Sequence, residues 1–156
     1  GCIIAALVKN IYGSSGIGAD ISHGAIRVAR RNIKTLNLTE QIKIIHGSFA
    51  NKNLTAEKFD VIVSNPPYIA HDDMRVNDGA MHDPKCALYA KNNGLAAYEQ
   101  IATNAKNWLK PDGRIYLEIG AGQKTAVQKI FKEAGWKFVR AEKDLSGITR
   151  VLVFTI

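Results

Sequence analysis

The sequence has few cysteines and no long apolar run. Its two cysteines, Cys2 and Cys86, are too few for a disulfide framework, and neither belongs to a Cys-x-x-Cys pair. The apolar segment 151–156 is far shorter than the roughly 18 residues that span a bilayer. No charged-then-apolar signal segment opens the chain, and the four histidines lack metal-ligand or triad spacing. We therefore expect a cytoplasmic protein without membrane association or a metal site.

Acidic residues are outnumbered by basic ones, 14 against 21, which gives a formal charge of +7. A basic excess favours anionic partners such as nucleic acid. The clearest cluster of basic residues lies along one face of a predicted helix. We call these four residues the basic stripe: Arg27, Arg30, Arg31 and Lys34. No aromatic residues are interleaved with it, as they are in stacking platforms. A solvated helix face is therefore favoured, and proximity to RNA or the ribosome stays open.

The 156 residues are 46% hydrophobic, which suffices for one core, so we expect one domain over residues 1–156. The chain begins Gly1-Cys2 without an initiator methionine, which indicates a piece of a longer protein. Hydrophobic periodicity predicts strands alternating with helices. The expected helices cover residues 3–10, 23–36 (Ser22 as N-cap, Asn37 as C-cap, with Ile26, Ala29, Ile33 and Leu36 facing the core), 95–109 and 127–134; the expected strands cover 17–21, 42–46, 59–64, 114–119, 136–141 and 149–156.

This order of elements predicts an α/β sandwich with a mostly parallel sheet. Residues 59–64 form an apolar run that suits a strand buried on both faces. Lys110-Pro111-Asp112-Gly113 is a turn signal. The last two strands are separated only by a short turn at residues 145–147, which requires an antiparallel pair at one edge. Residues 69–93 are polar and are expected to form a long functional loop, in which His71 and His82 are candidates for contact with a protein substrate.

Open α/β sheets bind ligands at the carboxyl ends of their strands. Asp20 ends the first predicted strand, 19 residues after Gly1, where nucleotide folds place a carboxylate that grips ribose hydroxyls. A turn residue that precedes a helix is an equally good interpretation of Asp20 alone. Gly47-Ser48-Phe49 ends the next strand, where a backbone amide and an apolar ring suit an adenine. Taken alone, that segment is better explained as a turn and a core Phe.

Asn65-Pro66-Pro67-Tyr68 directly follows the strand at 59–64 and carries a stronger signal. Two successive prolines remove two N–H donors and fix φ, so the chain leaves the sheet along a rigid extended path. The Pro66 carbonyl and the Asn65 side-chain carbonyl are then two acceptors that can hold both hydrogens of a planar –NH2 group. Tyr68 supplies a flat wall beside them.

Asn65-Pro66-Pro67-Tyr68-Ile69 resembles the corresponding segment of the HemK-type release-factor glutamine methyltransferases, within the class I methyltransferase superfamily. The similarity runs along nearly the whole chain, through Gly18-Ala19-Asp20-Ile21-Ser22, Asp83-Pro84, Ala87-Leu88-Tyr89, Asn93-Gly94-Leu95, Leu109-Lys110-Pro111-Asp112-Gly113, Leu117-Glu118-Ile119-Gly120 and Lys143-Asp144-Leu145-Ser146-Gly147. The resemblance implies a Rossmann-like class I sandwich that ends on an antiparallel edge hairpin.

The resemblance also implies a reaction and a set of site residues. The reaction is N5-methylation of the glutamine in the Gly-Gly-Gln motif of peptide chain release factors, with S-adenosylmethionine as donor and S-adenosylhomocysteine as product. Asn65, Pro66 and Tyr68 would be catalytic and, with Pro67, would bind the substrate glutamine. The cofactor would be bound by Gly1, Asp20, Ile21, Ser48, Phe49 and Asn65. Glu118 ends a strand nearby and is better explained as a supporting carboxylate.

The family's glycine-rich loop is represented here only by its final Gly1-Cys2, and the first central strand that precedes this loop is absent from the sequence. The family's helical N-terminal domain has no counterpart in this sequence either. We therefore expect the 156 residues alone to bind cofactor weakly or not at all.

Two other functions stay open. The same tetrapeptide can hold the –NH2 group of a flipped base, as in adenine-N6 or guanine-N2 methyltransferases of nucleic acids. An inactive, truncated module is the non-enzymatic alternative.

Overall fold

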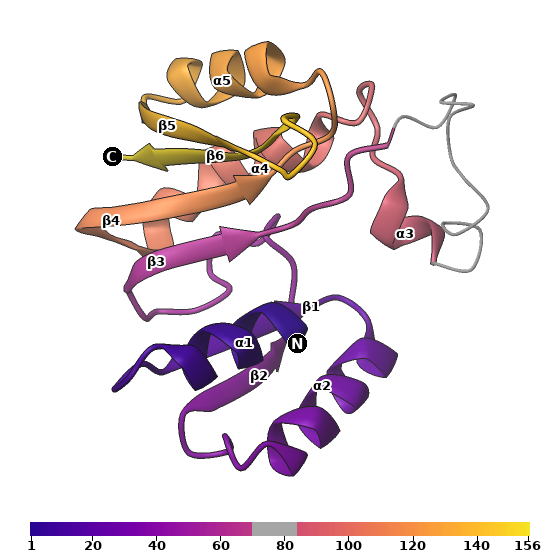
Figure 1. Ribbon diagram of the computed structural model, residues 1–156, viewed down its shortest axis with the longest axis vertical. Coiled ribbons are helices and arrows are strands. Elements are labelled where there is room, and N and C mark those ends of the chain that lie inside the picture. Colours follow the sequence, from indigo (N-terminus) through magenta and orange to yellow (C-terminus); the bar gives the residue numbers. More distant parts are fainter. Residues whose placement is uncertain (70–83) are drawn as a thin grey trace. The chain divides into compact units, whose positions relative to one another are not determined.

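The computed structural model describes residues 1–69 and 84–156 and divides the chain into two compact units, residues 1–54 and 55–156 (Figure 1). Each unit has its own sheet and its own buried apolar side chains. The expectation of one domain over residues 1–156 stays a prediction. Both units alternate strands with helices, as the periodicity of the sequence predicts.

The first unit contains two helices and a two-stranded parallel sheet. Its elements are α1 (Cys2–Asn10), β1 (Gly16–Asp20), α2 (His23–Thr35) and β2 (Ile42–His46), with β1 paired to β2. Their apolar faces meet in one cluster of buried side chains: Ala5, Ile26, Ala29, Ile33, Leu38, Ile42 and Ile44. The two glycines of β1 let α1 approach closely, because a Cβ on Gly16 or Gly18 would lie 3.0 or 3.4 Å from the Ile4 side chain.

The ends of α2 follow ordinary capping chemistry. The Ser22 hydroxyl accepts a backbone N–H of the first turn at 3.3 Å, which confirms the predicted N-cap. The C-cap is Leu36, and Asn37 follows it with φ +57°, the left-handed conformation that asparagine tolerates. The expected C-cap is therefore one residue too late. Leu36 is also 39% exposed rather than buried, because the chain reverses at Asn37 and brings Leu38 into the core instead.

The second unit contains a four-stranded sheet of order β3-β4-β6-β5. Its elements are β3 (Phe59–Ser64), α3 (Lys85–Leu88), α4 (Ala96–Asn104), the 3-10 helix η2 (Ala105–Trp108), β4 (Leu109–Glu118), α5 (Lys124–Glu133), β5 (Lys137–Lys143) and β6 (Thr149–Thr155). β3 is parallel to β4, whereas β6 is antiparallel to both β4 and β5. The α/β class and the antiparallel hairpin at one edge are confirmed.

The core of the second unit lies between the sheet and α5, with α4 packed beside α5. Phe131 of α5 is fully buried and stacks on Phe154 of β6, with ring centroids 4.4 Å apart. The Trp136 ring lies 5.4 Å from Phe131, and its indole N–H donates to the Ala102 carbonyl of α4 at 2.8 Å. This aromatic cluster fixes α5 on the sheet.

The expectation that β3 is buried on both faces is wrong. Val61 and Val63 are 49% and 39% exposed. In the register of the sheet, Ile62 lies beside Ile115, and Ile115 lies beside Phe154. Because Phe131 of α5 stacks on Phe154, α5 covers the face that carries Ile62. Val61 and Val63 point to the opposite face because side chains alternate along a strand.

The turn expected at residues 110–113 lies inside an interrupted strand. Phe59 pairs with Leu109 and Val61 with Arg114, so β4 has extra residues between these two pairs. A Cβ on Gly113 would lie 2.6 Å from the Leu109 side chain, which shows how tightly the chain folds back. The sequence signal therefore marks a bulge that delays regular pairing until Arg114, and the strand begins earlier than expected.

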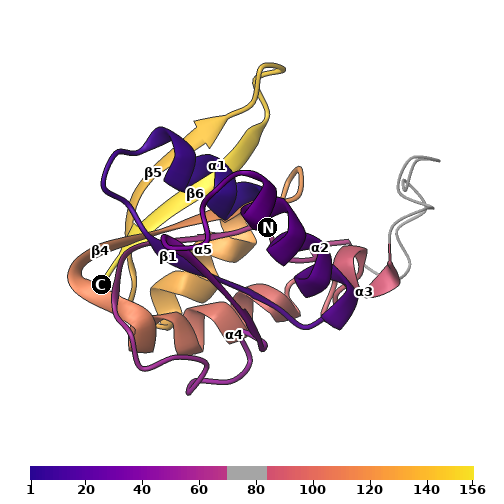
Figure 2. The ribbon, with the colours of Figure 1, turned by 90° about the horizontal axis from the view of Figure 1, so that it is seen from below.

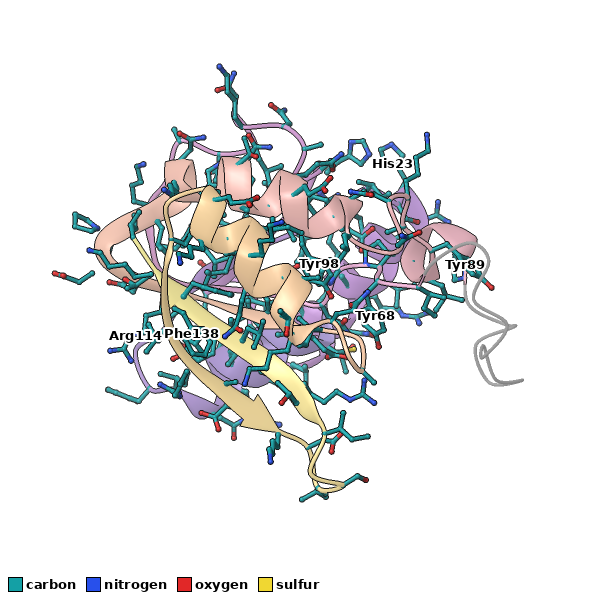
Figure 3. The ribbon with its side chains drawn as sticks, turned by 90° about the horizontal axis from the view of Figure 1, so that it is seen from above. His23, Tyr68, Tyr89, Tyr98, Arg114 and Phe138 are labelled. Carbon is teal, nitrogen blue, oxygen red and sulfur yellow. The ribbon has the colours of Figure 1, made fainter. Side chains whose placement is uncertain are left out.

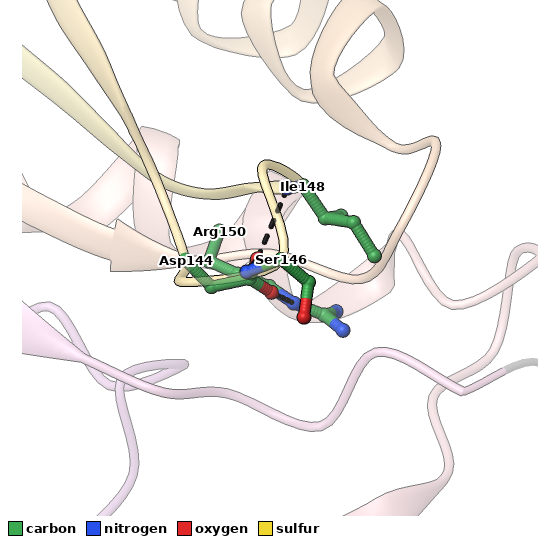
Figure 4. Close-up of polar contacts among 4 residues, drawn as sticks. All are labelled: Asp144, Ser146, Ile148 and Arg150. Atoms are coloured by element: carbon green, nitrogen blue, oxygen red, sulfur yellow. Dashed lines mark hydrogen bonds and ion pairs between the residues drawn. The ribbon is translucent and has the colours of Figure 1, made fainter.

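The β5–β6 hairpin projects at one end of the sheet, and Asp144 organises its turn (Figure 2, Figure 4). One carboxylate oxygen accepts the backbone N–H groups of Ser146 at 2.9 Å and Ile148 at 3.0 Å. The other accepts the Arg150 guanidinium at 3.0 Å. The Ile148 N–H and the Arg150 charge lower the pKa of Asp144 below its ordinary value of 3.8.

We predict that Asp144→Asn lowers the free energy of unfolding of the full-length protein at pH 7. A carboxylate with a lowered folded-state pKa stabilises the fold above its unfolded pKa, and this stabilisation is lost as pH falls through the folded pKa. The difference from the unsubstituted protein should therefore be present at pH 7 and shrink below pH 3.8. Urea unfolding across this range measures it, with Asp112→Asn as a control that changes an exposed aspartate. A difference that stays constant with pH would contradict the ion pair.

Candidate active site

The Asn65–Tyr68 segment leaves the carboxyl end of β3 without regular secondary structure. Pro66 is buried, Pro67 and Tyr68 are half-buried, and Asn65 is exposed. Within the described part of the chain the Asn65 side chain makes no hydrogen bond, so its carbonyl can accept one from a ligand. Buried Pro66 holds the backbone directly beside this exposed amide. The local arrangement is a fixed backbone that presents one free acceptor side chain.

A side chain from another loop holds the far end of this segment. Gln123, the N-cap of α5, donates from Nε2 to the Tyr68 carbonyl at 3.0 Å. Its Oε1 accepts the Gly120 backbone N–H at 2.9 Å. Gly120 comes two residues after the end of β4, and β3 and β4 are parallel neighbours. The carboxyl ends of both strands are thus tied together by one side-chain amide.

Tyr98 of α4 supports the same place, and its side chain lies near Tyr68 in Figure 3. Its hydroxyl donates to the Glu118 carbonyl at 3.0 Å and lies 3.5 Å from Gln123 Oε1. The side chain is fully buried, and this burial raises the pKa of Tyr98 well above its usual value. The hydroxyl therefore remains a protonated donor at all physiological pH values. Glu118 takes part here through its backbone carbonyl.

Gly94 packs against the Tyr68 carbonyl from a third segment. Gly94 has φ +81°, and a Cβ on it would overlap the Tyr68 carbonyl oxygen and lie 2.9 Å from Gln123 Nε2. The two preceding residues, Asn92 and Asn93, also have positive φ values of 55° and 52°. Successive left-handed residues are uncommon outside glycine and mark locally strained backbone. This strained turn lies directly beside the Asn65–Tyr68 segment.

The described residues of the loop expected at 69–93 contain regular structure. Ile69 forms a parallel bridge with Tyr89, donating to the Leu88 carbonyl and accepting from the Ala90 N–H, both at 2.9 Å. The short helix α3 precedes this bridge. These backbone bonds fix the residue that follows Tyr68. His71 and His82 lie outside the described residues.

The predicted cofactor residues of the first unit gather at the carboxyl edge of the β1–β2 sheet. The Gly47 N–H donates to the Asp20 carbonyl at 3.0 Å, so Ser48 and Phe49 follow directly beside Asp20 and Ile21. One Asp20 carboxylate oxygen accepts the Ser22 N–H at 2.8 Å. This is the helix-preceding turn, and it leaves the second oxygen without a partner among the described residues. Asp20 is exposed, so both interpretations of this residue are compatible with the structure.

Gly1 starts α1 at the same end of this unit, because the turn at residues 11–15 joins the other end of α1 to the start of β1. A Cβ on Gly1 would lie 2.8 Å from the Ala29 side chain of α2. The residue is therefore a close-approach glycine between two helices. The Ser48 hydroxyl is engaged in its own turn, accepting the Ala50 N–H at 3.1 Å.

Comparison with known proteins identifies the family. A family model described as a methyltransferase domain matches residues 2–141. The chain belongs to the methyltransferase domain family. It is 44% identical over 157 aligned residues to a bifunctional methyltransferase of Rickettsia felis, covering 99% of this chain and 30% of that protein. It is 37% identical over 155 residues to the release factor glutamine methyltransferase of Caulobacter vibrioides, covering 98% of this chain and 53% of that protein.

A solved structure has the same fold as this chain. A methyltransferase from Pyrococcus furiosus superposes with a TM-score of 0.72 at 17% identity, covering 99% of this chain and 68% of that one. The resemblance to release-factor glutamine methyltransferases is confirmed by curated relatives such as that of Caulobacter vibrioides. This methyltransferase domain spans at most about half the length of the two curated relatives named above.

The remaining candidates of the methyltransferase domain have mainly structural surroundings. All four residues of the basic stripe are exposed on α2, but Arg30 donates to the Ile44 carbonyl at 2.9 Å. An RNA contact there stays a prediction. His46 stacks on His23, with centroids 4.1 Å apart. Among the described residues, no cluster of three or more His, Cys, Asp or Glu side chains could hold a metal ion, and no helix is long and apolar enough to cross a bilayer.

Sequence reasoning missed the support of the candidate site by Gln123, Tyr98 and Gly94. Tyr98 matches the helical periodicity of a core residue, so its polar role has no separate signal. Gln123 is different, because it follows a strand end in the segment Gly120-Ala121-Gly122-Gln123. The rule that ligand-site residues follow the carboxyl ends of strands, applied to every strand, would have marked this loop.

Proposed function

We propose that the protein to which these residues belong transfers a methyl group from S-adenosylmethionine to the side-chain nitrogen of the glutamine in the Gly-Gly-Gln motif of a peptide chain release factor. The observation that carries the proposal is the exposed amide of Asn65, which makes no hydrogen bond to a described residue, beside the buried Pro66 at the end of β3. The similarity to release factor glutamine methyltransferases, over 98% of this chain in one case, supports it.

The residues of the first unit suit the donor. Asp20 has one carboxylate oxygen free of described partners, which fits a hydroxyl group of a ribose. Ile21 is 54% exposed and Phe49 is half-buried, so both offer apolar surface to an adenine ring. Gly1 adds a backbone without a side chain at the start of α1. When bound, S-adenosylmethionine supplies an electrophilic methyl group on a sulfonium.

The residues of the second unit suit the acceptor. A glutamine amide is a weak nucleophile because its nitrogen lone pair is conjugated with the carbonyl. In the proposed complex, Asn65 Oδ1 and the Pro66 carbonyl each accept one N–H of this amide, which fixes the nitrogen and removes it from water. Holding a nucleophile in line with its target supplies much of the rate enhancement in such reactions. Tyr68 limits the movement of the amide plane.

The proposed transfer balances without an additional reactant. The amide nitrogen forms a bond to the methyl carbon while the carbon–sulfur bond breaks. The electron pair of the broken bond remains on sulfur, which gives S-adenosylhomocysteine. The alkylated nitrogen is acidic and loses its proton to water. A strong general base is therefore unnecessary at this site.

The proposal is tested by measuring which substrate receives the methyl group. The full-length protein is incubated with radiolabelled S-adenosylmethionine and either a release factor, DNA or RNA. We expect label in the release factor, and none when the glutamine of its Gly-Gly-Gln motif is replaced by alanine. Label in nucleic acid alone would instead support an amino methyltransferase of bases, and no label in any substrate would support the inactive module.

A further inference from the structure

Three segments that are distant in the sequence meet at the Tyr68 carbonyl. The first is the acceptor segment 65–69, the second is the left-handed turn that ends at Gly94, and the third is the loop Gly120–Gln123. The first segment supplies the carbonyl, the second supplies a glycine that lets the chain approach it closely, and the third supplies the hydrogen-bond donor. The Gln123 side chain donates a hydrogen bond to this carbonyl at 3.0 Å.

The orientation of the Gln123 amide is fixed by the kind of partner at each end. Its Oε1 faces a donor, the Gly120 N–H, and its Nε2 faces an acceptor, the Tyr68 carbonyl. A rotated amide would place oxygen against oxygen and NH2 against N–H.

Two glycines allow this contact to close. A Cβ on Gly120 would lie 2.8 Å from Gln123 Oε1 and 3.0 Å from the Tyr68 ring. A Cβ on Gly94 would overlap the Tyr68 carbonyl oxygen. Both glycines are buried, and any larger residue would force the segments apart. The close packing therefore centres on the backbone of Tyr68, three residues after the exposed Asn65.

We propose that Gln123 is a positioning residue of the methyltransferase, which holds the Tyr68 carbonyl and thereby fixes the direction in which Asn65 and the Pro66 carbonyl present their acceptor oxygens. This inference rests on the proposed function, because it assigns those oxygens to the substrate amide. Gln123 itself does not touch the substrate. Two prolines transmit the constraint, since Pro66 and Pro67 have fixed φ and leave little freedom between Asn65 and Tyr68.

The test uses Gln123→Glu and Gln123→Ala in the full-length protein. Glu keeps an acceptor for the Gly120 N–H but places a carboxylate oxygen against the Tyr68 carbonyl, and Ala removes both hydrogen bonds. A displacement of about 1 Å at a reacting group lowers rates by about 100-fold. We expect kcat to fall by about 10- to 100-fold in both variants, whereas KM for the donor changes little. Gln128→Glu, on the same helix, is the matched control and should keep full kcat.

Two readouts separate this inference from the choice of substrate. Rates are measured on whichever substrate the unsubstituted protein labels, so a nucleic-acid substrate would overturn the proposed function and leave the positioning role tested. Hydrogen exchange of the Gly120 amide needs no substrate, and it should be at least about tenfold faster in Gln123→Ala because Oε1 is its acceptor. Unchanged kcat in both variants, or unchanged exchange at Gly120, would overturn the positioning role.

Discussion

Replacing Asn65 by alanine should lower kcat for methyl transfer by about 100- to 1,000-fold, the range seen when one preorganised hydrogen-bonding group is removed from an active site. The substitution removes an acceptor for the substrate N–H while leaving the backbone of the rigid Pro66-Pro67 segment in place. Because Asn65 is exposed and makes no hydrogen bond to a described residue, the free energy of unfolding should change by less than about 0.5 kcal/mol.

Asn107→Ala is the matched control for this experiment. Asn107 is also an exposed asparagine of the second unit, but it precedes β4, whereas Asn65 follows β3. Since β3 and β4 are parallel, the two residues lie at opposite ends of the sheet. Steady-state rates and urea unfolding of both variants are compared. Equal rates for Asn65→Ala and Asn107→Ala would remove Asn65 from the catalytic machinery.

Replacing Phe131 by alanine should lower the free energy of unfolding of the second unit by about 3–5 kcal/mol, as for other buried aromatic-to-alanine changes. Phe131 is fully buried between Phe154 and Trp136, and its removal leaves a cavity between α5 and the sheet. Activity should fall as well, because α5 carries Gln123 at its N-terminus. Chemical denaturation of the full-length protein measures the first effect.

Phe138→Ala provides the comparison within the same aromatic cluster. Its ring lies edge-on to Phe154 at 5.8 Å, but the side chain is 46% exposed on the edge strand β5. We expect a loss of about 1 kcal/mol, since little additional apolar surface reaches water. If the two variants destabilise equally, the core is not centred on Phe131.

The order of the elements could be predicted because it depends on local patterns. The helix at α2, for example, follows from Ser22 and the spacing of Ile26, Ala29 and Ile33, all of which lie within one segment. The faces of β3 could not be predicted in the same way. An apolar run shows that both faces of a strand carry apolar side chains, but it does not show whether both faces are covered. The exposure of Val61 and Val63 depends on which elements pack against each face.

In the candidate site, too, the residues marked by a local pattern could be predicted, whereas the contacts between distant segments could not. Asn65 to Tyr68 were found because their types and their order carry the signal in one short stretch. The contact between Gln123 and Tyr68 joins residues 55 positions apart, and no local pattern encodes such a pairing. The bulge at residues 110–113 is an intermediate case, in which Pro111 and Gly113 mark a turn but the pairing partner on β3 decides where the strand begins.

The most direct test of the central claim is the position of the transferred methyl group. A release factor is treated with the full-length protein and S-adenosylmethionine, digested, and sequenced by tandem mass spectrometry, in parallel with a reaction that contains Asn65→Ala. We predict one methyl group on the side-chain nitrogen of the Gly-Gly-Gln glutamine, with the Asn65→Ala reaction almost unmodified. A methyl group on any other residue, or equal modification by Asn65→Ala, would contradict the assignment of this site to a glutamine amide.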